Sequence, residues 1–206
     1  EVSTPAGTTT TITLSDGTEV LLSANSRLTY HKDFSDEKRE VTLVGEARFN
    51  VAKDAERPFI VHTRQLQTQV LGTIFDVKAY PQTPADVTLY EGKVEVSLNG
   101  TAPRQMQPGE QAFLNKEGKL QLAKASEEKG KWAEGEFAFD NRELMAVMQE
   151  IGSWYNISVV FHSRPLLEER IYFRMERVKE VKGVLQVLND MGIAKFEIVD
   201  DRIVVK

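Results

Sequence analysis

Val70-Leu71-Gly72-Thr73-Ile74-Phe75-Asp76-Val77 is an alternating apolar segment with a glycine inside it. At the two-residue period of a pleated strand, Leu71, Phe75 and Val77 share one face, and Ala79 extends that face. We therefore predict a single β-strand across this stretch, with its apolar face buried in a core.

The same layout occurs in residues 41–51, around Gly45, and in residues 90–98, around Gly92. A glycine weakens a strand unless the backbone must bulge, turn a corner or approach another segment closely. Gly45, Gly72 and Gly92 are therefore predicted to be corners of one stacked β core. Their spacing is uneven, so the repeat is only solenoid-like, and ordinary β-bulges in a sandwich fit the pattern equally well.

A second local signal predicts a hairpin near the start of the chain. In residues 12–22, Asp16-Gly17 separates two apolar runs. This pair is a strong hairpin signal because a primed turn needs positive φ angles. From residue 8 to residue 122 strand patterns and turn signals alternate without a helical period. This part of the chain is therefore predicted to be all-β.

The composition changes near residue 124. Residues 126–134 are mostly charged or small, and we interpret them as a linker. Beyond them the apolar period becomes helical, and the residues predicted on one helix face are Leu144, Val147, Met148, Ile151 and Tyr155. A second amphipathic helix is predicted over residues 178–191, ended by Gly192.

These patterns predict a mainly β protein with an added α+β part. Residues 1–125 form an all-β domain of solenoid-like or sandwich type. Residues 126–134 are the linker, and residues 135–206 form a small β-α-β-β-α-β-β domain.

Composition narrows the range of functions. The net charge is -5, and 26 Lys and Arg residues are scattered among 31 Asp and Glu residues. Without a basic cluster to follow a phosphate backbone, nucleic acid is not expected as a partner. The sequence has no cysteine, which excludes disulfides, thiolate catalysis and cysteine-ligated metals. No run approaches the roughly 20 apolar residues that a membrane-spanning helix needs.

No catalytic pattern is present. His31, His62 and His162 have no second ligand at a metal-binding spacing, and the serines lie in no nucleophile elbow. Adjacent carboxylates along the chain usually point into water rather than form a catalytic pair. We therefore expect no enzyme activity, no cofactor and no metal. Trp132 and Trp154 could form a sugar-stacking platform, although such aromatics are more often core residues.

The end of the chain is a candidate partner-binding segment. Ile203, Val204 and Val205 form a terminal apolar strand, which is expected at a sheet edge with unpaired N–H and C=O groups. Such an edge can accept a strand from a partner. The alternative is that this strand is paired internally and closes the sheet.

The order of the motifs in residues 8–122 resembles the FecR family. These motifs are Leu14-Ser15-Asp16-Gly17-Thr18-Glu19-Val20, Val44-Gly45-Glu46-Ala47-Arg48-Phe49-Asn50-Val51, Arg57-Pro58-Phe59-Ile60-Val61, Leu71-Gly72-Thr73-Ile74-Phe75-Asp76-Val77 and Glu91-Gly92-Lys93-Val94. The residues that carry the pattern are Gly17, Gly45, Phe49, Gly72, Phe75 and Gly92. The tail is similar to the C-terminal domain of the Bacteroidetes branch, which resembles the secretin and TonB short N-terminal fold.

The resemblance implies a membrane-anchored anti-sigma factor whose periplasmic part is the present segment. Its implied partner is the signalling domain of an outer-membrane TonB-dependent transducer for a glycan or an iron chelate. The implied target is an extracytoplasmic-function sigma factor, bound through a cytoplasmic segment outside this sequence, as is the inner-membrane anchor. A glycan-binding or adhesion module in the periplasm or at the cell surface is the alternative function.

Overall fold

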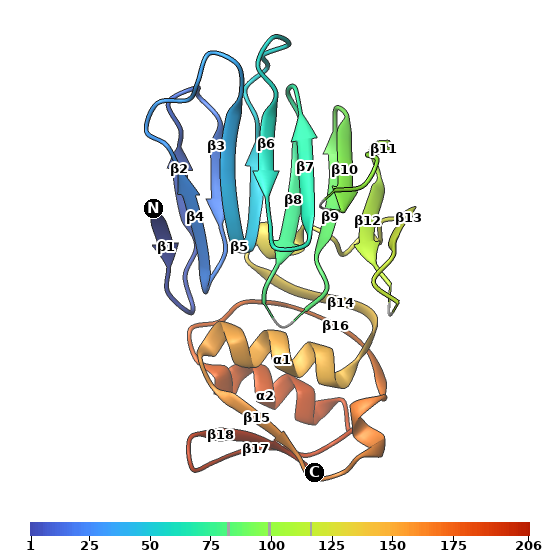
Figure 1. Cartoon of the computed structure of the whole chain (residues 1–206). Coiled ribbons are helices and arrows are strands. Elements are labelled where there is room, and N and C mark those ends of the chain that lie inside the picture. The colour runs from blue at the N-terminus through green and yellow to red at the C-terminus, as the bar shows by residue number, and fades with distance from the viewer. Residues whose placement is uncertain (82, 99, 116) are drawn as a thin grey trace. The chain divides into compact units, whose positions relative to one another are not determined.

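The computed structural model describes residues 1–81, 83–98, 100–115 and 117–206 (Figure 1). The chain divides into two compact units, residues 1–125 and residues 126–206. The prediction of a mainly β protein is confirmed, because strands greatly outnumber helices in the described residues.

Two β-sheets that share one strand build the first unit. The strands are β1 (Val2–Thr4), β2 (Thr10–Thr13), β3 (Glu19–Leu22), β4 (Ser26–Tyr30), β5 (Arg39–Asn50), β6 (Phe59–His62), β7 (Leu66–Val70), β8 (Ile74–Ala79), β9 (Asp86–Glu91), β10 (Val94–Leu98), β11 (Arg104–Met106), β12 (Glu110–Leu114) and β13 (Leu120–Lys124). One sheet has the order β1-β4-β5-β6-β7-β10-β11, and the other has the order β2-β3-β5-β8-β9-β12-β13. The long strand β5 therefore belongs to both (Figure 1).

Gly45 marks the point where β5 passes from one sheet to the other. Up to Val44 the strand pairs with β4 and β6, and from Gly45 onward it pairs with β8 and then β3. Gly45 has a φ of 107°, and a Cβ there would lie 2.7 Å from the Ser26 Cα. Only glycine permits both this φ and this approach without strain.

The predicted single strand over residues 70–77 is wrong, because two strands of different sheets meet there. β7 ends at Val70, and β8 begins at Ile74 on the other sheet. Leu71 lies in the connection and is 49% exposed, so it does not share the buried face of Phe75. Gly72 was predicted to be a corner, but the apolar alternation continues through it, so the two strands resemble a single strand in the sequence.

The corners at Gly72 and Gly92 stack on each other. Gly72 has a φ of 155°, and a Cβ there would lie 2.9 Å from the Lys53 Cα. Gly92, with a φ of 92°, sits where the chain passes from β9 to β10, and its Cβ would lie 2.8 Å from the Gly72 carbonyl oxygen. Close backbone approach thus leaves no room for a side chain at either corner.

The predicted hairpin at Asp16-Gly17 is confirmed. β2 and β3 pair antiparallel, and Gly17 in the turn has a φ of 85°. Asp16 holds the turn by accepting hydrogen bonds from the Thr18 backbone N–H and hydroxyl, at 3.0 and 2.7 Å.

The core of the first unit lies between the two sheets. The rings of Phe49 and Phe75 stack with centroids 5.2 Å apart, and Phe59 packs against Phe49 at 6.0 Å. All three rings are fully buried. The aromatic cluster joins β5, β6 and β8, so it links both sheets through one set of contacts.

The second unit has two helices between two small sheets (Figure 1). Its elements are η1 (Lys131–Glu134), β14 (Glu136–Glu143), α1 (Leu144–Tyr155), β15 (Ser158–Phe161), η2 (Pro165–Leu167), β16 (Arg170–Glu176), α2 (Val181–Asp190), β17 (Phe196–Val199) and β18 (Arg202–Val205). β14 pairs with β16, and the other sheet has the order β15-β18-β17. The predicted linker, residues 126–134, is grouped with this unit and contains the buried Trp132.

The expectation that Ile203, Val204 and Val205 lie at a sheet edge is wrong. Their strand, β18, is central, pairing in parallel with β15 and antiparallel with β17. Ile203 and Val205 are fully buried, and Val204 is 7% exposed. A continuous apolar, β-branched run suits a strand that is paired on both sides and covered by a helix layer. The edges of this sheet are therefore β15 and β17.

Candidate partner-binding surface

No metal centre is found among the described residues. They contain no group of three His, Asp or Glu side chains placed to hold a metal ion. His62 instead lies 3.1 Å from a carboxylate oxygen of Glu40. Partial burial works against ionisation of Glu40, but hydrogen bonds from Lys38 and His62 outweigh it and lower the pKa of the carboxyl. No helix of the described residues is long and apolar enough to cross a bilayer.

The candidate sugar-stacking aromatics are engaged in packing. Trp132 is only 8% exposed. The Trp154 ring contacts the ring of Phe137 edge-on at 6.3 Å, and the Arg177 guanidinium lies 4.1 Å from its centroid. Trp132 is therefore buried, and Trp154 is engaged by Phe137 and Arg177.

Arg48, Asp76 and Tyr90 form a polar network in the first unit. Arg48 donates to both carboxylate oxygens of Asp76, at 2.8 and 3.0 Å, and the Tyr90 hydroxyl donates to the same carboxylate at 2.8 Å. The guanidinium also lies over the Tyr90 ring, 4.7 Å from its centroid. Burial and the adjacent Asp76 charge raise the pKa of Tyr90 far above its usual value. The cluster ties β5, β8 and β9 together.

A groove lies between α2 and β17. Its volume is about 380 Å³, against about 100 Å³ for a hollow in the first unit beside Val44 and Tyr80. The residues that line the groove are Lys182, Leu185, Gln186, Asn189, Phe196 and Ile198. The four residues on α2 are spaced by three or four positions and form one stripe along the helix. The groove therefore runs beside a sheet edge.

β17 exposes one edge of its backbone along this groove. Lys195 and Lys206 exchange both backbone hydrogen bonds, at 2.9 and 3.0 Å. In an antiparallel ladder hydrogen-bonded and non-hydrogen-bonded pairs alternate, so Glu197 and Val199 also face β18. The N–H and C=O groups of Phe196 and Ile198 consequently point away from β18, toward the outer edge.

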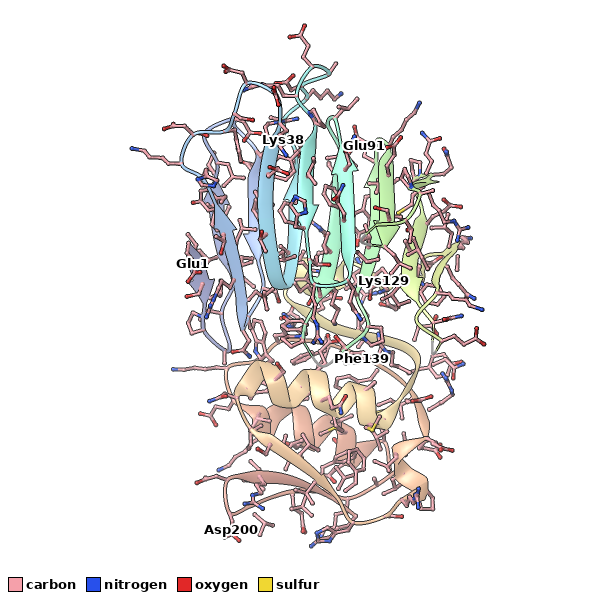
Figure 2. The ribbon with its side chains drawn as sticks, viewed as in Figure 1. Glu1, Lys38, Glu91, Lys129, Phe139 and Asp200 are labelled. Carbon is pink, nitrogen blue, oxygen red and sulfur yellow. The ribbon has the colours of Figure 1, made fainter. Side chains whose placement is uncertain are left out.

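Exposed apolar side chains occur on both elements that form the groove, although only Ile198 of them lines it. Four of them belong to α2, β17 or the residue after α2, and they are Val187, Met191, Ile198 and Val199, with 37 to 42% exposure. Glu197 alternates with Phe196 and Ile198 along the strand, so its side chain lies on the opposite face. Hydrogen bonds from Lys195 and Lys206 lower the pKa of Glu197 to about 2. Asp200 occupies the turn at the tip of the β17–β18 hairpin (Figure 2).

The residues singled out from the sequence have structural roles in the two units. The FecR-like motif residues Gly17, Gly45, Phe49, Gly72, Phe75 and Gly92 occupy turns, corners and the core of the first unit. The predicted binding strand is central rather than at the edge. The groove was not predicted, although Lys182, Gln186 and Asn189 form a polar stripe on the amphipathic helix that could have indicated it.

Both units of the chain match known protein families. Residues 1–95 match the family described as FecR protein, and residues 136–205 match the family described as FecR, C-terminal. Among curated proteins, no sequence matches this chain.

Two crystal structures of a proposed anti-sigma factor from Parabacteroides distasonis are similar over nearly the whole chain. One has a TM-score of 0.90 at 30% identity and covers 100% of this chain and 97% of that chain. The other has a TM-score of 0.89 at 30% identity, with 99% and 96% coverage. The likeness therefore extends across both units.

Proposed function

The chain belongs to the FecR family of anti-sigma factors, and from this we propose that it is the periplasmic, signal-receiving region of a membrane-anchored regulator. Its partner would be the signalling domain of an outer-membrane TonB-dependent transducer. The event would pass to an extracytoplasmic-function sigma factor through a cytoplasmic segment outside this sequence.

The single observation that carries this proposal is the full-length likeness to a proposed anti-sigma factor at 30% identity. The family is regulatory. The aromatic and charged side chains described above, such as Trp154 and Arg48, take part in packing and in internal ion pairs, which agrees with such a role. The stripe on α2 and the free edge of β17 add a surface with the chemistry of protein recognition, because a free sheet edge and exposed apolar side chains suit a polypeptide.

The two units suit different tasks in this function. The first unit shares β5 between its sheets, and its aromatic cluster joins both, so it would behave as one rigid spacer. The second unit has a groove beside the outer edge of β17, and it would receive the partner.

Calorimetric titration tests the proposal directly. The chain is titrated with each purified signalling domain of the TonB-dependent transducers from the same organism. We expect micromolar or tighter binding to one of them and none to the others, because a receiver must distinguish its own transducer. Absence of binding across the whole set would overturn the proposal.

A further inference from the structure

The side chain of Asn189 occupies the position of a neighbouring strand on β17. The Phe196 N–H donates to Asn189 Oδ1 at 2.8 Å, and Asn189 Nδ2 donates to the Phe196 carbonyl oxygen at 2.9 Å. A residue of an adjacent antiparallel strand would make the same two bonds, because its C=O would accept from the Phe196 N–H and its N–H would donate to the Phe196 carbonyl oxygen. The carboxamide therefore shows which chemistry satisfies this edge, namely that of a peptide backbone.

The Asn189 carboxamide bonds only one residue of the outer edge of β17, which is Phe196. Ile198, two positions further along, also directs its N–H and C=O away from β18. Neither group has a protein partner in the described part of the chain, and the Ile198 side chain is 38% exposed. Asn189 is itself exposed, so its carboxamide can rotate away without opening the core.

We propose that the outer edge of β17 binds one extended strand of a protein partner, which replaces the Asn189 carboxamide and lies along the groove beside α2. The inference rests on the proposed function and assigns the strand to the transducer's signalling domain. The incoming strand would bond the backbone of Phe196 and Ile198 and extend the order β15-β18-β17 by one strand.

The groove also specifies the side chains of the bound strand. Those that point to the helix face would meet Leu185 and Ile198, which favours apolar residues. Lys182 lies in the same stripe, is exposed and forms no ion pair among the described residues. An Asp or Glu of the partner strand would be placed against this ammonium group, so the strand is apolar with one acidic residue.

The backbone contact is tested with Ile198→Pro in the whole chain. Proline removes an N–H that points to the outer edge and takes no part in the β17–β18 ladder, so the fold tolerates it better than at Glu197 or Val199. We expect binding of the signalling domain to weaken roughly tenfold or more. Ile198→Ala, which keeps the N–H and removes the side chain, is the matched control and should weaken binding less.

The charge contact is tested with Lys182→Glu, for which Lys179→Glu is the control. Both lysines are exposed, but only Lys182 lines the groove. Lys182→Glu should weaken binding, more strongly at low salt, and Lys179→Glu should have a much smaller effect. Asn189→Ala removes the capping carboxamide and should bind as tightly as the unaltered chain or tighter.

The outcomes separate this inference from the proposed function. If the unaltered chain binds a signalling domain but folded Ile198→Pro and Lys182→Glu bind equally well, the function stands and the strand-addition site is wrong. If the unaltered chain binds none, both fail. If sedimentation shows a dimer of this chain that Ile198→Pro abolishes, the occupant of the edge is a second copy, and the inference is overturned.

Discussion

Arg39 Nη1 lies 2.7 Å from Asp16 Oδ2, and this ion pair is buried, with side-chain exposures of 0% and 5%. The guanidinium also donates to the backbone carbonyls of Arg57 and Ala52, at 3.0 and 2.8 Å. The pair therefore joins the β2–β3 hairpin to the start of β5 and to the segment after it.

Asp16→Ala should lower the free energy of unfolding of the first unit by about 3–5 kcal/mol, because it leaves a buried, uncompensated guanidinium. Urea unfolding followed by circular dichroism measures this. Tryptophan fluorescence serves as the internal control, since both tryptophans, Trp132 and Trp154, lie in the second unit. The double variant Asp16→Ala/Arg39→Met should lose less than the sum of the single losses, and strict additivity would show that the two groups are not coupled.

Gly45→Ala should destabilise the first unit more than Gly17→Ala does. Both glycines have positive φ angles, of 107° and 85°, but a Cβ at Gly17 meets nothing within 4 Å. Gly17→Ala thus measures the cost of the backbone conformation, about 1 kcal/mol, and Gly45→Ala adds the clash with Ser26, for a total of about 2–4 kcal/mol. Thermal unfolding that shows equal losses would contradict the close approach of the two chain segments at this corner.

Phe75→Ala and Leu71→Ala distinguish the observed corner from a continuous strand. Phe75 is fully buried and stacked on Phe49, so its truncation should cost about 3–5 kcal/mol. Leu71 is half exposed, and its truncation should stay within about 0.5 kcal/mol. Similar losses in urea unfolding would indicate instead that both side chains share the buried face.

The second unit should lose stability in acid through Glu197. Hydrogen bonds from Lys195 and Lys206 lower the pKa of this carboxyl from 4.5 to about 2, so the folded state favours the ionised form. The stabilising contribution is therefore present above pH 4.5 and is lost as the pH falls toward 2. Glu197→Gln should flatten this part of the pH profile of unfolding, recorded by tryptophan fluorescence, and an unchanged profile would exclude the contribution.

Local pattern was sufficient for much of the fold. The hairpin at Asp16-Gly17 and the all-β character of the first unit follow from turn chemistry and two-residue alternation. The helices α1 and α2 follow from the period of their buried residues, as in Leu144, Val147 and Ile151. These signals depend only on residues that are close in sequence, so they can be recognised without knowing the tertiary structure.

The candidate site depended on contacts between distant residues. β18 is central because β15, far earlier in the chain, pairs with it in parallel. The local sequence Ile203-Val204-Val205 contains no signal of that pairing. The same pairing leaves β17 as the edge, and Asn189 reaches Phe196 only because α2 folds back beside that strand.

The sequence by itself determined most of the strands and both α-helices, which residues are buried in most of them, and where glycine is needed. Tertiary structure decided the strand order, the change of sheet at Gly72 and the groove beside β17. The physical reason is that periodicity reports which face of an element is covered, whereas the identity of the covering element depends on loop closure and packing across the whole unit.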